Sequence, residues 1–209
     1  MIPSKKELQA ICDLRFSPQV YEKLQQSQVA IAGLGGLGSN VAVMLTRTGI
    51  GKLKLIDFDR VDLSNLNRQV YDIRHLGQPK TEALSQRLWE INPYIELELY
   101  NGRITEDEAA DVFYGYRYIC EAFDGAEDKA MLAQQVLCAM PDAYLVSGSG
   151  MAGYQDADQI RTRKINSRFF VCGDECSDVA KGIGLMAPRV AVCAGHQANK
   201  IIQLILEER

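Results

Sequence analysis

Short apolar segments alternate along this chain with longer segments in which apolar residues recur every three or four positions. The short apolar segments predict strands at residues 29–32, 53–56, 95–100, 118–122 and 144–147. The periodic segments predict helices at residues 39–48, 80–91, 129–139 and 190–207. Because strands and helices alternate, we expect an α/β fold with a doubly wound, mostly parallel sheet.

The sequence contains no internal repeat, low-complexity tract or linker that would divide it. We therefore expect residues 1–209 to form a single domain, with residues 1–27 as an N-terminal helical segment. Two polar segments without steady periodicity, residues 60–79 and 166–188, are expected to be loops. Long loops in compact domains often carry function, so both segments are candidates for the site.

The composition is ordinary for a globular protein, with 47% hydrophobic and 24% charged residues, which is enough apolar material for one core. The formal net charge is −4 and the sequence has no basic stripe, which argues against a nucleic-acid partner. No apolar run approaches the roughly 18 residues of a membrane span, and the first residues are too charged for a signal peptide. We therefore expect a cytoplasmic protein that binds neither membranes nor nucleic acid.

The six cysteines are scattered through a chain long enough to fold without disulfides, which fits a reducing compartment. They are Cys12, Cys120, Cys138, Cys172, Cys176 and Cys193. Cys172 and Cys176 form the one close pair, whereas a structural zinc site needs four ligands, usually from two such pairs. We therefore expect loop or buried thiols here rather than bound zinc.

A glycine-rich segment with the pattern G-x-G-x-x-G follows the first predicted strand and precedes the first predicted helix. Its glycines are Gly33, Gly35, Gly36 and Gly38. Backbone N–H groups and a helix N-terminus can receive phosphate there, which predicts a Rossmann-like nucleotide-binding loop. Asp57 follows about 20 residues later at the end of the second strand, where a carboxylate can accept hydrogen bonds from ribose hydroxyls. The alternative is a tight turn whose glycines only allow close helix–strand packing.

The segments after this acid favour ATP over a dinucleotide. An NAD-dependent dehydrogenase would have the same loop and acid, so the glycines leave the nucleotide open. Residues 64–69 place Arg68 among amide side chains, and residues 77–80 end with Lys80 at a predicted helix start. Each cation alone is typical of a solvated surface. Together they would neutralise a triphosphate, which a dinucleotide does not require.

These motifs make the sequence resemble the ThiF/MoeB/HesA family, the bacterial relatives of ubiquitin-activating enzymes. The resemblance rests, in chain order, on Gly33–Gly38, Asp57–Asp59, Ser64–Gln69, Gly77–Lys80, Ile91–Pro93 and Met186–Pro188. It spans nearly the whole chain, and six motifs in the right order are far more specific than one glycine loop. The length is most similar to the short ThiF-type branch associated with thiamine synthesis.

The resemblance implies roles for the matching residues. The nucleotide-binding set would be Gly33, Gly35, Gly36, Gly38, Asp57, Asp59, Asn65, Arg68 and Lys80. Arg68 and Lys80 would act catalytically on the triphosphate, and Asp124 matches the family's magnesium-associated aspartate. Without the resemblance, Asp124 could equally be a carboxylate that ends a strand or caps a helix.

The resemblance also implies an activity. The protein would use ATP to activate the C-terminal Gly-Gly carboxylate of a ubiquitin-like sulfur carrier protein of the ThiS type, forming an acyl-adenylate and pyrophosphate, and it would act as a homodimer. A terminal carboxylate is already ionised at neutral pH, so the reaction needs no general base. We therefore expect His75 and His196 to be structural. The glycine-rich segment 147–153 could admit an extended Gly-Gly tail, unless it is only a flexible turn.

The sequence departs from the family's pattern at three places. Relatives of this kind supply an arginine to the neighbouring protomer's ATP site from a segment with two arginines, but Pro18 stands at the second position here. Either Arg15 substitutes or this contact is lost. A second cysteine pair for zinc is missing. The position comparable to the cysteine that links covalently to a carrier is Ala180, so we expect no thioester step, and Cys176 is expected to be a non-catalytic loop thiol.

Other functions stay open. The carboxylate could belong to a small molecule or to a tRNA-modification intermediate, although the lack of a basic patch weighs against tRNA. The chain could be a catalytically idle nucleotide-binding scaffold in a heterodimer, but it retains Asp57, Arg68, Lys80 and Asp124. An NAD-dependent dehydrogenase is a more distant alternative.

Overall fold

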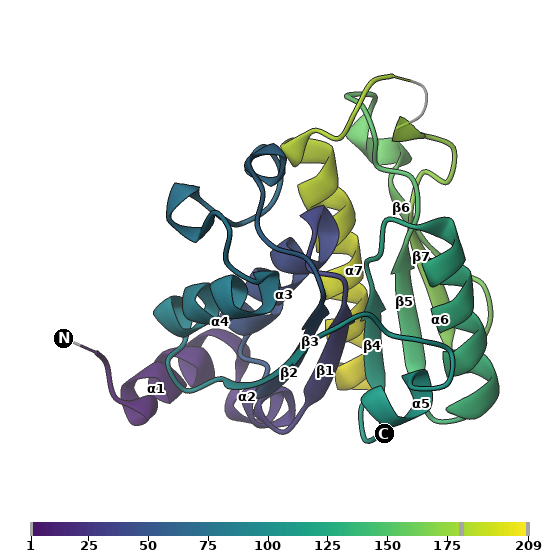
Figure 1. Ribbon diagram of the computed structural model, residues 1–209. Helices are drawn as coiled ribbons and strands as arrows, with labels where there is room; N and C mark the ends of the chain where they lie inside the picture. Colours follow the sequence, from purple (N-terminus) through teal and green to yellow (C-terminus); the bar gives the residue numbers. More distant parts are fainter. Residues whose placement is uncertain (1, 180–181, 208–209) are drawn as a thin grey trace.

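The computed structural model describes residues 2–179 and 182–207 and contains a seven-stranded sheet in the order β3-β2-β1-β4-β5-β7-β6. Neighbouring strands are parallel except for β6, which runs antiparallel to β7 at the edge. The strands are β1 (Gln28–Ala32), β2 (Lys52–Asp57), β3 (Glu96–Asn101), β4 (Tyr118–Glu121), β5 (Tyr144–Gly148), β6 (Arg161–Lys164) and β7 (Phe169–Gly173). The predicted α/β fold with a mostly parallel sheet is therefore confirmed (Figure 1).

Helices cover both faces of the sheet. They are α1 (Lys5–Phe16), α2 (Pro18–Gln25), α3 (Gly36–Thr48), α4 (Lys80–Ile91), α5 (Ala109–Val112), α6 (Ala126–Ala139) and α7 (Ala187–Glu207). Single turns of 3-10 helix occur at Leu63–Asn65, Ile73–His75 and Ala157–Gln159. Side chains of α2, α3, α4 and α7 belong to one buried core and those of α5 and α6 to the other, so the sheet is doubly wound (Figure 1).

Alternating side chains of the central strands supply the two cores. In β1, Val29 and Ile31 face the core under α3 and α7, whereas Ala30 and Ala32 face the core under α6. All four are completely buried. This explains why the strand reads as a continuous apolar run rather than an alternating one, as expected for a parallel strand buried on both faces.

The structure corrects one prediction and adds elements that the pattern did not indicate. The predicted loop 166–188 contains strand β7, which pairs with β5 and β6. Strand β6 has a basic sequence and lies at the exposed sheet edge, where no apolar alternation is needed. The helices α3, α6 and α7 begin about one turn earlier than predicted, because their first residues carry little apolar periodicity. Residues 60–79 contain only 3-10 turns and one isolated bridge.

Two further expectations concern the position comparable to a carrier-linking cysteine and the absence of a membrane span. Ala180 lies outside the described residues. In the part of the chain that the structure describes, every helix is too short or too polar to cross a membrane.

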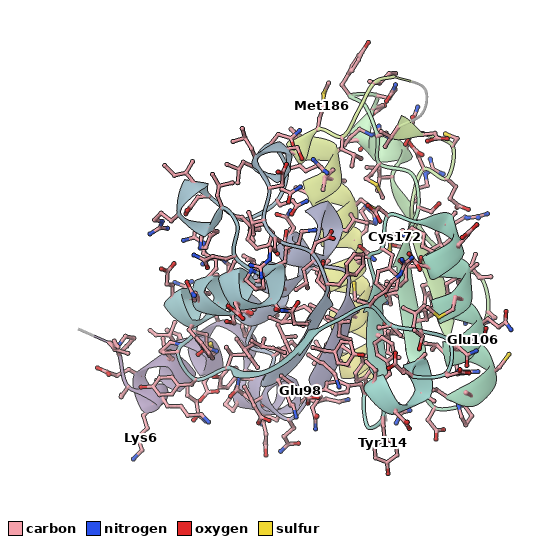
Figure 2. All side chains as sticks on the ribbon, in the orientation of Figure 1. Lys6, Glu98, Glu106, Tyr114, Cys172 and Met186 are labelled. Atoms are coloured by element: carbon pink, nitrogen blue, oxygen red, sulfur yellow. The ribbon has the colours of Figure 1, made fainter. Side chains whose placement is uncertain are left out.

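The edge strand β3 is tied to the sheet by charges, which leads to a pH prediction. Glu98 (Figure 2) lies 2.6 Å from Lys54 Nζ and accepts a 2.9 Å hydrogen bond from Tyr116. The Lys54 hydrogen bond is the main cause that lowers the pKa of Glu98 from 4.5 to about 2. Because the folded pKa is depressed, Glu98 stabilises the fold above pH 4.5, and this contribution is lost as the pH falls toward 2.

Glu98→Gln should therefore lower the free energy of unfolding at pH 7, by less than about 1 kcal/mol because solvent screens the half-exposed carboxylate. The difference from the unsubstituted protein should shrink as the pH falls from about 4.5 to about 2. Urea unfolding at a series of pH values measures this. Glu96→Gln is a control on the same strand, since among the described residues Glu96 pairs with Lys52 alone. A difference that does not change with pH would contradict the prediction.

Candidate functional site

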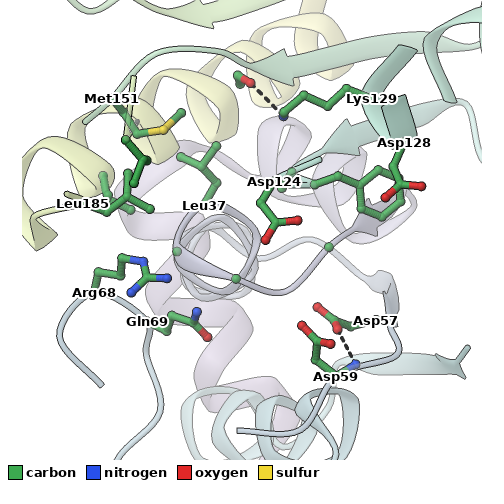
Figure 3. A pocket seen from close by; sticks show the side chains of 18 of the residues that line it. Leu37, Asp57, Asp59, Arg68, Gln69, Asp124, Asp128, Lys129, Met151 and Leu185 are labelled. Carbon is green, nitrogen blue, oxygen red and sulfur yellow. Dashed lines mark hydrogen bonds between the residues drawn. The ribbon is translucent and has the colours of Figure 1, made fainter. Parts of the chain in front are cut away.

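A cavity of about 420 Å³ lies at the carboxyl ends of strands β1, β2, β4 and β5. Strands β2 and β4 flank β1 on opposite sides, so the order in which strands are added to the sheet reverses at β1. In open α/β sheets this is the place where ligands bind. The lining residues include, in chain order, Gly33, Gly35, Gly36, Asp57, Asp59, Asn65, Arg68, Lys80, Asp124, Lys129, Gly148 and Met151 (Figure 3).

The glycine loop holds its shape because two of its residues have no room for a side chain. Gly33 has a φ of +89°, and a Cβ there would lie 2.7 Å from the carbonyl oxygen of Ala122 at the end of β4. A Cβ on Gly38 would overlap the carbonyl oxygen of Gly33. At Gly35, by contrast, a Cβ would meet nothing closer than 3.8 Å, because the space before it is open. The loop is therefore packed on one side and accessible on the other.

The N-terminus of α3 opens toward this accessible side. Its N-cap is Gly35, and no described side chain caps the helix. The first N–H groups of a helix lack partners within the helix and carry partial positive charge, so they attract anions. The loop therefore has the uncapped backbone that the predicted phosphate site requires, and phosphate binding itself remains a prediction.

Asp57 joins the glycine loop to the end of β2. Its two carboxylate oxygens accept hydrogen bonds from the backbone N–H groups of Leu34, at 2.6 Å, and Asp59, at 2.8 Å. Burial raises the pKa of Asp57, and the nearby Lys80 ammonium opposes that rise. The carboxylate is thus already used to fix the loop, while its residue also lines the cavity. Its predicted contact with ribose remains a prediction.

Lys80 and Asp59 form an ion pair beside Asp57. Lys80 Nζ lies 2.7 Å from Asp59 Oδ2 and 3.9 Å from Asp57 Oδ2, and the lysine side chain is only 7% exposed. Lys80 is the first residue of α4, and its position follows from the turn at Pro79 that starts the helix. The structure therefore brings the predicted lysine and both predicted aspartates together at one side of the cavity.

Arg68 lies across the helix N-terminus from these acids. Its Nη1 donates to the Ser64 carbonyl at 2.9 Å and to Asn67 Oδ1 at 2.8 Å, which fixes the guanidinium. Its buried Nε has no hydrogen-bond partner among the described residues. Asn65 Oδ1 accepts a bond from the Asp62 N–H at 3.0 Å and so shapes the turn that carries Arg68. Residues 60–79 therefore form the arginine side of the cavity.

Asp124 follows strand β4 and is exposed in the cavity. Figure 3 shows its carboxylate pointing toward the glycine loop. The next residue, Gly125, is the N-cap of α6, and no described side chain caps that helix. Asp124 is therefore not the cap of α6, whereas the other alternative, a carboxylate that follows a strand end, agrees with its position after β4. Among the described residues its carboxylate has no hydrogen-bond or ion-pair partner, and it lies close to the predicted phosphate site.

A second part of the cavity is apolar and lies beyond the end of β5. Residues 148–152 line it together with Leu37, Val179 and Leu185. The loop is held by hydrogen bonds from Ala152 N–H to Ser177 Oγ at 3.0 Å and from Gly153 N–H to the Gly184 carbonyl at 2.8 Å. The predicted glycine-rich turn is therefore an ordered wall of the cavity rather than a free loop.

Sequence reasoning missed several residues near the cavity. Arg103 lies 3.1 Å from Asp128 and 5.7 Å from the ring centroid of Phe58, so these three side chains close one end of the cavity. In the wall of the cavity, Lys129 pairs with the buried Glu121. A glutamate at the end of an apolar strand was a visible signal, but its lysine partner lies within a helix and looks like a surface residue.

The remaining candidates lie elsewhere. Cys172 is buried in β7 (Figure 2), where burial raises the pKa of its thiol to about 11, whereas Cys176 is exposed. His75 is buried and accepts a hydrogen bond from the Asp72 N–H at 3.0 Å, while His196 lies 3.0 Å from the Thr162 hydroxyl. Arg15 is exposed at the end of α1 and is not among the described residues that line the cavity.

Residues 9–209 match the sequence model of the ThiF family. Ubiquitin-like modifier-activating enzyme 5 of Caenorhabditis briggsae is 45% identical over 46% of this chain and 22% of its own length. Molybdopterin-synthase adenylyltransferase of Haemophilus influenzae is 38% identical over 66% of this chain and 60% of its own. tRNA threonylcarbamoyladenosine dehydratase of Bacillus subtilis is 33% identical over 74% and 61%, respectively. The chain thus spans less than two thirds of the length of these curated relatives.

The fold also resembles solved structures. The Escherichia coli tRNA N6-threonylcarbamoyladenosine dehydratase, solved with AMP, superimposes with a TM-score of 0.86. The match covers 99% of this chain and 98% of that one at 24% sequence identity. It establishes that the two chains share one architecture.

Proposed function

The chain belongs to the ThiF family, and from this premise we propose that it is an adenylyltransferase that uses ATP to activate the C-terminal carboxylate of a ubiquitin-like sulfur carrier protein. The observation that carries the proposal is the content of one cavity. It combines a helix N-terminus, two cations at Arg68 and Lys80, and the free carboxylate of Asp124. A triphosphate needs positive charge along its length, and the helix N-terminus and the two cations supply it.

The reaction follows from the chemistry of these groups. A carboxylate oxygen of the acceptor attacks the α-phosphorus of ATP, the bond from that phosphorus to the bridging oxygen breaks, and pyrophosphate leaves. The acceptor is already ionised because a terminal carboxyl has a pKa near about 3.5. The main obstacle is repulsion between anions, which Arg68, Lys80 and the α3 amides reduce. We assign the glycine loop and Asn65 to phosphate binding and Asp57 and Asp59 to the ribose side.

Asp124 fits a magnesium ion bound together with ATP. Among residues 2–179 and 182–207, no group of three or more His, Cys, Asp or Glu side chains could hold a metal by itself. Mg²⁺ does not need such a group, because it keeps several waters and binds through one or two carboxylates and the substrate's phosphates. When bound, it would neutralise phosphate charge. The free Asp124 carboxylate beside the phosphate loop supplies the single protein ligand that this arrangement requires.

Asp124→Asn should then weaken the dependence on magnesium without disturbing the fold, because Asp124 is exposed. We expect the Mg²⁺ concentration for half-maximal ATP binding to rise by about tenfold. Calorimetric titration of ATP at a series of Mg²⁺ concentrations measures it. Asp128→Asn is a control in the first turn of α6, close in sequence to Asp124, since that carboxylate pairs with Arg103. Equal effects of the two substitutions would refute the assignment of Asp124.

The apolar part of the cavity suits an extended Gly-Gly tail. Gly150 has a φ of +81° and lies in a wall held by its own hydrogen bonds, so the wall is preformed. The name of the relative from Haemophilus influenzae says that it adenylylates molybdopterin synthase, which is a protein substrate. We infer a protein carrier here as well, and propose thiamine biosynthesis as the pathway because the chain belongs to the ThiF family. The resemblance further implies that the protein is a homodimer and that it acts in the cytoplasm. Light scattering of the pure protein tests whether it forms a dimer.

The deciding experiment is ATP–pyrophosphate exchange by the purified protein with Mg²⁺, with and without small carriers that end in Gly-Gly. We expect exchange only when a carrier is present. Carriers of the thiamine and molybdopterin types, compared at equal concentration, distinguish the pathways. A carrier shortened by its final glycine is the matched control. No exchange with any of them would refute the proposed substrate.

A second candidate function acts on tRNA, and the relative from Bacillus subtilis favours it. That relative is named for threonylcarbamoyladenosine in tRNA and is similar over 74% of this chain. The net charge of −4 weighs against RNA binding, because phosphate contacts need Lys and Arg. ATP turnover stimulated by modified tRNA but not by a carrier would favour this candidate. ATP binding with no turnover on either substrate would indicate an idle scaffold.

A further inference from the structure

An ion pair between the buried Glu121 and Lys129, a partly exposed residue that lines the cavity, joins three elements. Glu121 ends strand β4 and its side chain is 1% exposed, and Lys129 comes from the first turns of α6. Lys129 Nζ lies 3.0 and 3.1 Å from the two carboxylate oxygens of Glu121. It also donates to the carbonyl oxygen of Gly148 at the end of β5, at 2.9 Å (Figure 3). The ammonium therefore links α6 to the ends of both strands.

The same carboxylate fixes the segment that carries Asp124. Glu121 Oε1 accepts a 2.7 Å hydrogen bond from the N–H of Phe123, the residue before Asp124. Glu121 Oε2 accepts a hydrogen bond from the Ser147 hydroxyl. Together with Lys129, these bonds occupy both oxygens of the carboxylate. The turn at Phe123 is thus bent around a buried charge rather than around apolar contacts.

A side chain from α7 completes the network. Gln197 is fully buried, and its Nε2 donates to the Glu121 carbonyl at 2.9 Å and to the Val146 carbonyl at 3.2 Å. It bridges β4 and β5 through the backbone of Glu121 and Val146. The network therefore collects residues from two strands and two helices that are far apart in the sequence.

Stability alone does not explain this arrangement. Removing two charges from water is costly, and apolar side chains of similar size often hold strand ends as well or better. An ion pair differs from an apolar pair in fixing direction, since each hydrogen bond specifies where a backbone group lies. The ion pair fixes the positions of two backbone groups, the Phe123 N–H and the Gly148 carbonyl. Phe123 comes directly before Asp124, and Gly148 begins the segment 148–152 that lines the cavity. The network therefore fixes these two parts of the cavity relative to each other.

We propose that the Glu121–Lys129 pair is a positioning device that sets Asp124, on the phosphate side of the cavity, against the Gly148–Ala152 wall, on the acceptor side. This inference rests on the proposed function, in which the acceptor carboxylate attacks ATP between these two sides of the cavity. Lys129 is a positioning residue and not a catalytic one. An ammonium has three protons to donate. Lys129 directs them at Glu121 and Gly148, so it does not depend on substrate for its partners.

The central test is Lys129→Met. We expect exchange at saturating ATP to fall by about ten- to a hundredfold, as is typical when an outer partner of a ligand is lost. The Mg²⁺ concentration for half-maximal ATP binding should rise, because Asp124 is less well placed. Combined with Asp124→Asn, the substitution should add little to that shift, since both act on one ligand. Lys129→Arg should restore part of the activity because a guanidinium can also bond Glu121 and Gly148.

Controls separate positioning from folding. Lys129→Met leaves a buried unpaired carboxylate and can destabilise the fold, so Glu121→Gln with Lys129→Met removes both charges and should recover thermal stability. Its magnesium dependence should stay shifted, because the turn before Asp124 has lost the charged carboxylate that accepts the Phe123 N–H. Lys200→Met, in the groove between α7 and β6, removes a lysine outside the network and should change neither quantity.

Three outcomes would overturn the proposal. The first is an unchanged Mg²⁺ concentration for half-maximal ATP binding in a folded Lys129→Met protein. The second is a shift of that concentration fully additive with the shift caused by Asp124→Asn. The third is an activity loss in the Glu121→Gln, Lys129→Met variant that follows the folded fraction alone. An increase only in the KM for the acceptor would instead make Lys129 a substrate contact. Failure of the proposed function is recognised separately, because ATP binding and its magnesium dependence remain measurable when the unsubstituted protein shows no exchange with any carrier.

Discussion

Arg68→Ala is expected to lower the rate of ATP–pyrophosphate exchange by about a hundred- to a thousandfold, which is the usual effect of losing one preorganised donor to developing charge. The guanidinium is held by Ser64 and Asn67, and its buried Nε has no hydrogen-bond partner among the described residues. It lies where the α3 amides point, so both would act on the same phosphates. Its removal leaves the repulsion between the incoming carboxylate and the triphosphate only partly neutralised.

The fold should survive this substitution, because Arg68 stands in a loop and its side chain packs over Gly36 rather than in either core. Arg68→Lys is the matched control. It keeps the charge but loses the planar geometry of the guanidinium, and should recover only a part of the rate. The measurement is exchange rate at saturating ATP together with a thermal unfolding curve. Unchanged turnover in a folded Arg68→Ala protein would remove this residue from the catalytic set.

A second large effect is expected from Gly38→Ala, this time on folding. A Cβ there would overlap the carbonyl oxygen of Gly33 and lie 3.1 Å from Ile31. Neither backbone group can move without separating α3 from β1, at the centre of the sheet. We expect a loss of about 3 kcal/mol in the free energy of unfolding, at the upper end of values for overpacked cores.

Gly35→Ala should behave in the opposite way. Its φ of −76° suits an alanine, and the added Cβ would enter the open space before the helix N-terminus. Stability should be nearly unchanged, whereas ATP affinity should fall because phosphate must approach that backbone closely. Chemical unfolding and calorimetric titration of ATP on both variants decide the matter. A Gly35→Ala protein that binds ATP normally would show that the phosphates do not lie against this residue.

Much of the architecture could be predicted from local signals. The strands and helices between Gln28 and Tyr100 follow the predicted segments closely, since each carries its own periodicity. The glycine loop is equally local, because the need for glycine at Gly33 comes from its φ and from a neighbouring strand end. The acid at the end of β2 was also predictable, as a polar residue that ends a buried strand. Its bonds to the backbone of Leu34 and Asp59 were not.

The sequence by itself therefore determined the α/β alternation, the glycine loop and the cations Arg68 and Lys80 that follow it, because propensity, periodicity and glycine conformation act over a few residues. Only the tertiary structure decided that β7 and β6 extend the sheet, since a strand exists only beside its partner and β5 is more than 20 residues away. It also decided that Lys129 is a partner of Glu121 and not a surface charge. Burial is set by what packs around a residue, and that is a property of the whole fold.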